Sequence, residues 1–337
     1  ILDRFCPSLC EAVVGQSDPA WSVRACIDWL ERADLLVPYQ EERRTWYRYH
    51  ALLRDFLRER QRARFGAEAV AGLHREAATW FAQEGMPHEA VQHALQSGDL
   101  NLAASLIEAR LCDELNREDR ATLEHWLAVL PEDLVQRRPR LLMMKAWSLQ
   151  LSWQLGAQAK LVSQVEALIG EDGGATLPPE EQQLLRGQVL VLQGQYAWLN
   201  NLATRRVACC EETLALLPRQ WTYVRGGARL FRGLGMGAMG QCQAAGRVML
   251  DEYESLGDKT AWYALRILHA LCLNYLNAGQ LEAARQTAQV MLQQAIRGGL
   301  DVMLCWARLV LGVVHYQWND LESAGVHFAE VVDRRYL

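Results

Sequence analysis

The chain has 337 residues, of which 50% are hydrophobic, and a formal net charge of −5 at pH 7. This composition predicts a folded chain with room for two or three ordinary domains, or for one domain and a solenoid. The negative charge argues against non-specific nucleic-acid binding by the whole chain, because such binding depends on neutralising phosphates. No apolar stretch approaches the roughly 18 residues of a membrane-spanning helix and no secretory leader stands at the start, so we expect a cytoplasmic protein without a membrane anchor.

The N-terminal segment combines short helices with a β-hairpin. Helical spacing covers residues 7–14 and 19–33, with Asp18 as the N-cap of the second helix and a proline at its first position. Two β-like stretches follow at 35–38 and 45–49, on either side of a charged turn. Helix, helix, hairpin and helix in this order are typical of a winged helix.

Similarity to a known family is specific in six stretches of the first third of the chain: Arg4–Val13, Trp29–Leu36, Trp46–Leu57, Leu73–Phe81, Glu89–Leu95 and Gly98–Leu100. These stretches resemble the MalT-type large ATP-binding activators of the LuxR class, and the last three look like the helical linker of that family. The resemblance is specific over roughly residues 1–130 and extends beyond them only at the level of repeat type.

Proteins of this family are signal-transduction ATPases. In them a P-loop nucleotide domain precedes the winged helix, and a superhelical sensor and a helix-turn-helix follow it. No G-x-x-x-x-G-K-[ST] pattern occurs in this chain, and we expect the DNA-reading domain of the family to lie outside these 337 residues. The resemblance therefore implies a fragment that contains the sensor and its coupling segment. ATP and DNA would be bound by domains that the chain lacks, and we expect no cofactor in the chain itself.

Four helix-pair boundaries recur in the second half of the chain. Each places a turn residue two positions before the next helix: Asn200-Asn201-Leu202, Gly240-Gln241-Cys242, Gly279-Gln280-Leu281 and Asn319-Asp320-Leu321. The steps are 40, 39 and 40 residues, which predicts stacked helix–turn–helix units. This pattern resembles tetratricopeptide repeats, with about six residues more than the usual ~34.

We therefore expect a mainly α fold, an α-solenoid of tetratricopeptide-like helix pairs preceded by a small winged-helix segment. The predicted domains are a winged helix over 1–60, a helical linker with the first helix pairs over 61–130, and a superhelical sensor over 131–337.

Small residues recur at the same places in each unit, and a further position of the same helix stripe follows one turn later. The nine positions are Gly233, Cys272 and Gly312 before the turn, Ala245, Ala284 and Ala324 after it, and Met249, Ala288 and Phe328 one turn further. Small side chains on both helices of a pair let ridges fit into grooves.

The segment Gly235–Gly240 matches the G-x-G-x-x-G pattern. A dinucleotide site requires a strand before this pattern, and here a helix precedes it, so we do not expect one. Glycines at 233, 235 and 237 within one helix are nevertheless costly, at roughly 1 kcal/mol each. Two explanations stay open: tight helix packing, which we favour, and a ligand that lies against exposed backbone.

His88 and His93 are five residues apart, so their side chains lie about 140° apart on a regular helix. This separation excludes a shared metal ion, and we expect both imidazoles to face solvent or a neighbouring helix.

An arginine-rich stretch at 43–64, with Trp46, Tyr47 and Tyr49 between the arginines, has the composition of a nucleic-acid patch. Acidic residues dilute it, and we favour a solvated helix face with local ion pairs.

In tetratricopeptide solenoids the first helix of each pair lines the concave surface. Counting back from each turn predicts eight ligand-binding residues: Trp198, Gly237, Arg266, His269, Asn277, Trp306, Tyr316 and Gln317. Planar aromatics combined with arginine, histidine and amides suit a polar small molecule. The alternative is that they are ordinary groove residues without a ligand.

Taken with the resemblance, these patterns predict the effector-sensing and autoinhibitory or oligomerisation region of a transcriptional activator. Its partners would be a small-molecule effector or a regulatory protein, the nucleotide domain of the same chain, and further copies on activation. The alternative is a free-standing tetratricopeptide scaffold for a peptide or protein partner. We expect no enzyme and no metal site, because no convergent acid–base or metal-ligand set stands out.

Overall fold

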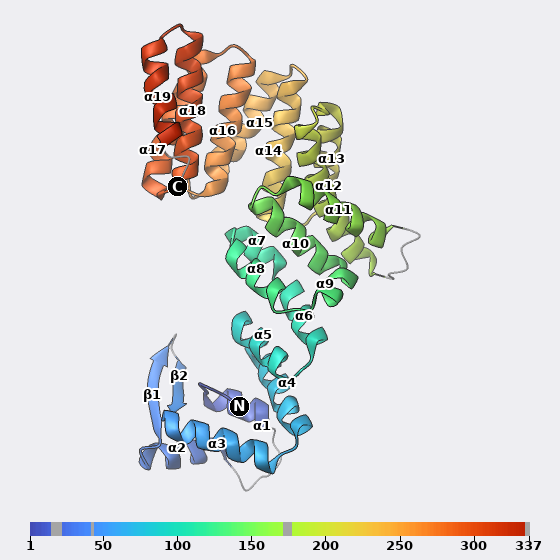
Figure 1. Cartoon of the computed structure of the whole chain (residues 1–337), viewed down its shortest axis with the longest axis vertical. Helices are drawn as coiled ribbons and strands as arrows, with labels where there is room; N and C mark the ends of the chain where they lie inside the picture. Colours follow the sequence, from blue (N-terminus) through green and yellow to red (C-terminus); the bar gives the residue numbers. More distant parts are fainter. Residues whose placement is uncertain (15–21, 42–43, 171–176, 334–337) are drawn as a thin grey trace. The chain divides into compact units, whose positions relative to one another are not determined.

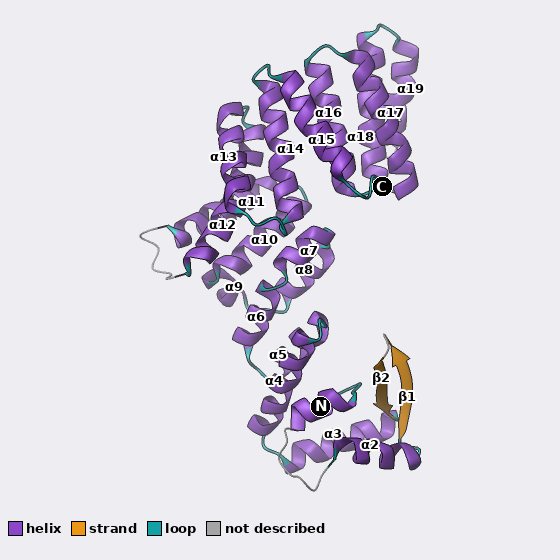
Figure 2. Cartoon of the chain, turned by 180° about the vertical axis from the view of Figure 1, so that it is seen from behind, coloured by secondary structure: helices purple, strands orange, loops and turns teal. Residues whose placement is uncertain are grey.

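The computed structural model describes residues 1–14, 22–41, 44–170 and 177–333 (Figure 1). They form 19 helices and one two-stranded hairpin, which confirms the predicted mainly α fold (Figure 2). The chain divides into two units, Ile1–Leu111 and Cys112–Leu337, and each is described on its own. None of the helices in the described ranges combines the length and apolar character needed to cross a bilayer.

The first unit begins with the predicted order of helix, helix, hairpin and helix. Its elements are α1 (Pro7–Val14), α2 (Val23–Arg32), β1 (Leu36–Glu41), β2 (Arg44–Tyr49) and α3 (Ala51–Arg64). The two strands are antiparallel, with Leu36 opposite Tyr49. Phe5 adds a short bridge to this hairpin, because its N–H and C=O both bond to the backbone of Tyr47. The predicted winged helix is confirmed.

The second helix starts later than predicted. It begins at Val23, and the Ser22 hydroxyl caps it by accepting a hydrogen bond from the N–H of Ala25 at 3.3 Å. The predicted cap Asp18 and the proline after it lie outside the described residues. The predicted helix start was wrong: the Asp-Pro pair served as the predicted N-terminal signal, although Ser22, which is also a preferred N-cap residue, is the actual cap.

Three further helices complete this unit: α4 (Ala67–Gln83), α5 (Pro87–Gln96) and α6 (Leu100–Glu108). Trp80 and Phe81 of α4 join the buried core of the winged helix, where Trp80 meets Trp46 edge to face at 6.1 Å. The predicted boundary at residue 60 falls inside α3, and the boundaries at 60 and 130 stay predictions.

The second unit is an array of helices. They are α7 (Leu111–Arg117), α8 (Arg120–Ala128), α9 (Glu132–Arg137), α10 (Pro139–Leu151), α11 (Leu155–Ile169), α12 (Pro179–Leu199), α13 (Ala203–Leu216), α14 (Thr222–Ala238), α15 (Cys242–Ser255), α16 (Trp262–Asn277), α17 (Leu281–Gly298), α18 (Asp301–Gln317) and α19 (Leu321–Asp333). From α10 onwards each helix packs against the next, and each first helix of a pair also packs against the first helix of the following pair (Figures 1 and 2). This pattern is an α-solenoid, as predicted.

The turn that ends each first helix requires a residue in the left-handed conformation. Asn201, Gly240, Gly279 and Asn319 have φ of 55°, 80°, 70° and 61°. Glycine adopts this conformation without strain, and asparagine is the usual second choice. The first boundary was predicted one residue too early, at Asn200, because two asparagines are adjacent there. The true steps are therefore 39, 39 and 40 residues.

Small residues allow the close helix contacts that their recurrence predicts. A Cβ atom at Gly233 would lie 2.7 Å from Cγ of Met249, and one at Gly312 would lie 2.4 Å from the ring of Phe328. Ala245 is fully buried in the same layer. In the pairs α14–α15 and α18–α19, the side chain one turn beyond the alanine therefore occupies the space that the glycine leaves.

Gly235 and Gly237, the other two glycines of the predicted costly set, serve the same purpose. A Cβ at Gly235 would meet Val207 at 2.7 Å, and one at Gly237 would meet Oδ1 of Asn274 at 2.6 Å. Helix packing thus accounts for all three glycines, and the alternative of a ligand against exposed backbone is wrong at these positions.

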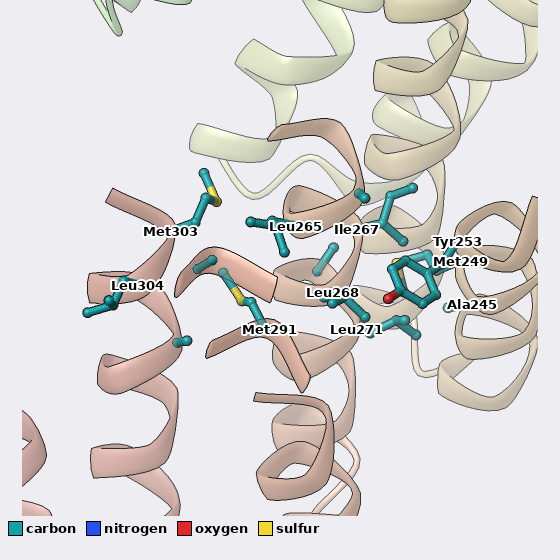
Figure 3. Packing of buried hydrophobic residues seen from close by; sticks show 14 residues of the cluster. Ala245, Met249, Tyr253, Leu265, Ile267, Leu268, Leu271, Met291, Met303 and Leu304 are labelled. Carbon is teal, nitrogen blue, oxygen red and sulfur yellow. The ribbon is translucent and has the colours of Figure 1, made fainter. Parts of the chain in front are cut away.

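The core of the array passes through α16 (Figure 3). Leu265, Leu268 and Leu271 of α16 meet Met249 of α15 and Met291 of α17 in one buried cluster. Met303 and Leu304 of α18 extend it towards the next pair. Each pair therefore buries its apolar side chains against its neighbours, which holds the first helices side by side.

Candidate functional site: a cavity between the first helices

A cavity of about 300 Å³ lies against α10, α12, α14, α16 and α18. Its lining is mostly apolar and includes six aromatic side chains: Trp147, Trp153, Tyr223, Phe231, Tyr263 and Trp306. The polar side chains that reach it are Gln150, Gln195, Arg266 and His269. An apolar, aromatic lining with a few polar groups is the usual composition of a small-molecule site.

The repeat itself builds most of this lining. Gly227, Arg266 and Trp306 occupy the same position in three successive pairs, at separations of 39 and 40 residues. Leu230 and His269 are likewise 39 residues apart and both line the cavity. One position on the inner face of each first helix therefore supplies a glycine, an arginine and a tryptophan, which makes the wall asymmetric.

A chain of hydrogen bonds runs along one wall. Tyr223 donates its hydroxyl to Oε1 of Gln150 at 3.1 Å and accepts a hydrogen bond from Nη1 of Arg266 at 3.0 Å. The other terminal nitrogen of Arg266 forms an ion pair with Glu118 at 2.5 Å. The guanidinium also lies over the Tyr223 ring, 5.3 Å from its centroid. These contacts fix the arginine in place.

Glu118 is held in position by the corner between α7 and α8. Its backbone is left-handed, with φ of 57°, and the next residue, Asp119, caps α8 through the N–H of Thr122 at 3.0 Å. Asn116 accepts a hydrogen bond from the N–H of Tyr223 at 3.0 Å, which ties this corner to the start of α14. A residue far away in sequence thereby becomes the counter-ion of Arg266.

Burial and the neighbouring charges act in opposite directions on the two partners of this ion pair. Burial opposes the charge of Arg266, but Tyr223 and Glu118 together raise the pKa of the guanidinium above its usual value. Burial raises the pKa of Glu118, and Arg266 offsets part of that rise. Each partner therefore favours the charged form of the other.

His269 has a different environment. Burial lowers the pKa of its imidazole to about 4, so the ring is neutral at pH 7. The ring meets Trp306 edge to face, with centroids 4.6 Å apart. Its buried Nδ1 atom has no hydrogen-bond partner among the described residues.

Three of the eight predicted site residues, Arg266, His269 and Trp306, come together at the cavity. Gly237 does not line it, because it is buried against Asn274, and its assignment to the inner surface is corrected.

The remaining predicted positions do not meet at the cavity. Asn277, Tyr316 and Gln317 are exposed in the last turns of α16 and α18, beyond the lining. The side chain of Trp198 lies outside the described residues.

Several lining residues were missed. Subtracting the repeat length from the predicted positions Arg266 and His269 gives Gly227 and Leu230, so the sequence held a signal for them. Glu118 does not line the cavity but pairs with Arg266, and the sequence gives no such signal for it because it precedes the regular repeats.

The two sequence motifs of the first unit have structural roles. His93 faces the neighbouring helix α4, which is one of the two expected settings: it stacks on Phe81, and its Nδ1 lies 2.8 Å from Nδ1 of His74. Arg44 pairs with Glu84 at 2.5 Å. Within the described parts of the chain, no group of three or more metal-ligating side chains is placed to hold an ion.

Comparison with known proteins agrees with the fold of each part. Residues 1–69 match the family model of the MalT winged helix domain. The serine/threonine-protein kinase PknK of Mycobacterium tuberculosis is 33% identical over 196 residues, and that of Mycobacterium bovis matches equally well. The match covers 57% of this chain but 17% of the kinase, so the chain corresponds to a small part of these relatives.

A crystal structure from Pyrococcus horikoshii matches 99% of this chain with a TM-score of 0.57 and 14% identity, over 49% of its own length. It is a signal transduction ATPase with numerous domains (STAND) protein with a tetratricopeptide repeat sensor. At this identity the match shows a shared fold. The chain thus combines a MalT-type winged helix with a tetratricopeptide-like helical array.

Proposed function

We propose that this chain is the effector-sensing region of a cytoplasmic, MalT/STAND-like transcriptional regulator of the LuxR class. A small-molecule effector binds in the cavity between α10 and α18. The observation that carries this proposal is the cavity itself, which brings aromatic, amide, arginine and histidine side chains of successive repeats to one place. The MalT winged helix match over residues 1–69 supports the regulatory role.

The sensing step follows from the way the cavity is built. Because its lining comes from five helices, a bound molecule contacts several repeats at once and favours one arrangement of the array over others. A switch from 1% to 99% active requires about 5.5 kcal/mol of differential binding. In the whole regulator this free energy would release an autoinhibited state for self-association, with ATP and DNA bound by other domains.

The first test is a thermal-shift screen of this chain against a metabolite panel. An effector at 100 times its Kd adds about 2.7 kcal/mol of stability. Gly227→Leu blocks the cavity, because a Cβ at Gly227 has only Val191 nearby, at 3.9 Å, and the added side chain extends into the lining. The matched control is Gly325→Leu, at an exposed helical position whose Cβ would have no neighbour within 4 Å.

We expect each true effector to stabilise the wild type and Gly325→Leu but not Gly227→Leu. A panel without any stabilising compound, or hits that persist in Gly227→Leu, would contradict the proposed site.

A further inference from the structure

We propose that the cavity takes an uncharged, flat molecule of one or two rings whose polar groups only accept hydrogen bonds, such as a ring ketone, and that the side-chain amides of Gln150 and Gln195 donate to it. This inference rests on the proposed function and names the chemical class of its effector. Three features of the lining carry it: amide donors without an acceptor, one arginine that already has a counter-ion, and aromatic rings that are open to the cavity.

The hydrogen-bond network fixes which end of the Gln150 amide is free. Arg266 can only donate, so the Tyr223 hydroxyl accepts from it and gives its own proton to Oε1 of Gln150. The amide nitrogen of Gln150 therefore points away from Tyr223. This nitrogen has no acceptor among the described residues and is not fully enclosed.

Gln195 on α12 repeats this arrangement. Its Oε1 accepts a hydrogen bond from Nε2 of Gln158 at 3.4 Å, and its own Nε2 has no acceptor in the described part of the chain. Like that of Gln150, this nitrogen is not among the fully enclosed atoms, and both side chains line the cavity. Two amide donors on neighbouring first helices thus remain available to an accepting group.

The other polar atoms of the lining are donors too, or are already bonded. The indole N–H groups of Trp153 and Trp306 have no acceptor within the described ranges. Trp147 donates to Gln188 at 2.9 Å. An oxygen that accepts hydrogen bonds therefore matches this lining, and a ligand N–H or O–H meets other donors instead.

The charge of the wall favours a neutral acceptor. Arg266 is the one charged side chain among the described lining residues, and Glu118 already pairs with it. A carboxylate on the ligand would lose its hydration among apolar side chains and would bring a second negative charge close to Glu118. A carbonyl oxygen accepts the same hydrogen bonds without either cost.

Aromatic rings that face the cavity favour a flat body. A volume of about 300 Å³ lies at the lower end of small-molecule sites, which suits one or two rings. Trp153 is 57% exposed at this lining, and Trp306 is half-buried. Open ring surface of this kind packs well against another ring, both edge to face and in offset stacks.

Trp153 also occupies a turn where a large side chain is unusual. It follows α10 with φ of 58°, the left-handed conformation that asparagine or glycine adopts after the later first helices. A bulky residue is rare in this conformation, and such outliers concentrate at functional sites. The turn itself does not require an indole, so contact with a bound ring supplies a reason for it.

Equilibrium dialysis with four probes of similar size tests this ligand class. Chromone carries a ring carbonyl and no donor, indole carries an N–H donor, naphthalene has neither, and 2-naphthoate adds a negative charge to its accepting oxygens. For the wild-type chain we expect chromone to bind about five- to tenfold more tightly than naphthalene, because one net hydrogen bond contributes that much. Indole should bind no more tightly than naphthalene, and 2-naphthoate more weakly than chromone.

Substitution of the two amides locates the effect. Gln150→Leu and Gln195→Leu together should bring the Kd values of chromone and naphthalene within about twofold of each other. Gln289→Leu on α17 is the matched control at an exposed position, and it should keep the wild-type preference. Thermal unfolding followed by circular dichroism shows whether each variant is folded. If the double variant is unfolded, at least one single variant should lower the preference twofold or more.

Trp153→Asn tests the flat body separately from the polar contacts. Asparagine holds the equivalent turn at Asn201 and Asn319, so the variant should keep or raise the midpoint of thermal unfolding. It should weaken chromone and naphthalene alike, by about three- to tenfold, because both lose the same ring contact. An unchanged Kd for both probes would exclude Trp153 from the site and contradict the flat body.

Three results would overturn the donor-lined class: indole binding more tightly than chromone, which would assign the polar contact to an accepting nitrogen such as that of His269; 2-naphthoate binding most tightly; or a preference for chromone that the double variant leaves intact. The proposed function depends instead on whether Gly227→Leu abolishes stabilisation by a metabolite. A charged metabolite that binds in the cavity would refute the ligand class and leave the sensor role standing. Probes that show the glutamine dependence without any metabolite hit would do the reverse.

Discussion

The two units use their aromatic side chains in opposite ways. In residues 1–111, Trp46, Trp80 and Phe81 pack against one another in a closed core, and Arg4 lies over Trp46 at 4.5 Å. In residues 112–337, five aromatic side chains of the first helices line a cavity. The first arrangement maximises burial, and the second leaves ring surface open to the cavity. A single fold-level label for the chain would hide this difference between a closed core and a cavity wall.

The largest loss of stability is expected from a substitution in the closed core of residues 1–111. Trp46→Ala removes a side chain that is 1% exposed and should lower the free energy of unfolding by about 3–5 kcal/mol. Trp306→Ala, at a half-buried position beside the cavity, should cost only about 1 kcal/mol. Urea unfolding followed by circular dichroism measures both. Equal losses would show that the cavity wall is as tightly packed as the core.

The second effect concerns the cavity wall. Arg266→Met leaves Glu118 without its counter-ion and should cost about 2 kcal/mol, allowing for the partial exposure of both groups. Glu118→Gln in the same chain should recover more than half of this loss, because the amide needs no counter-ion. A double-mutant cycle gives the coupling free energy. A coupling near zero would mean that the pair does not stabilise the wall.

Two glycines of α14 differ in the space around them: Gly233 is packed against a neighbouring helix, and Gly227 borders the cavity. Gly233→Ala should destabilise the array by about 1–3 kcal/mol, because its Cβ meets Met249 at 2.7 Å. Gly227→Ala should stabilise it by up to about 1 kcal/mol, because the helix gains a better former and the cavity has room. Thermal unfolding of the two variants shows whether the stability falls in one and rises in the other. A loss of stability in both variants would contradict the open space at Gly227.

The smallest effect is a dependence on pH. Burial lowers the pKa of His269 and that of His93 to about 4, from an ordinary value of 6.5. The unfolded chain therefore binds more protons than the folded one between pH 6.5 and 4, so stability falls as the pH is lowered through this range. We expect a loss of about 1 kcal/mol per ring after allowing for partial exposure. Unfolding at several pH values tests it: His269→Phe should flatten the curve for residues 112–337, and an unchanged curve would refute the assignment.

The repeat can be predicted from the sequence because each unit contains the same local pattern of residues. A left-handed turn residue and buried small residues recur in every pair, so the period, the close helix contacts and three cavity residues follow from spacing alone. The first boundary was misplaced by one residue because Asn200 and Asn201 are chemically equivalent choices for one turn. Local signals of this kind cannot separate neighbours of the same type.

The rest of the site could not be predicted, since it depends on contacts between distant positions. Glu118 and Arg266 are 148 residues apart in sequence. No local pattern around either residue predicts that the two form an ion pair. Gln150 accepts from Tyr223 across 73 residues in the same way. Gly237 is likewise covered by Asn274, a residue of the next pair, and this contact cannot be predicted from the residues around Gly237.

The bond between Glu118 and Arg266 has a consequence for how the molecule opens. Solenoids usually contact only adjacent repeats, so their ends fray independently and folding spreads from any point. Here the ion pair between Glu118, at the corner between α7 and α8, and Arg266 of α16 connects helices that are several pairs apart in sequence. Helices α7 to α16 should therefore exchange their amide hydrogens as one cooperative block, while α18 and α19 exchange earlier, outside that connection.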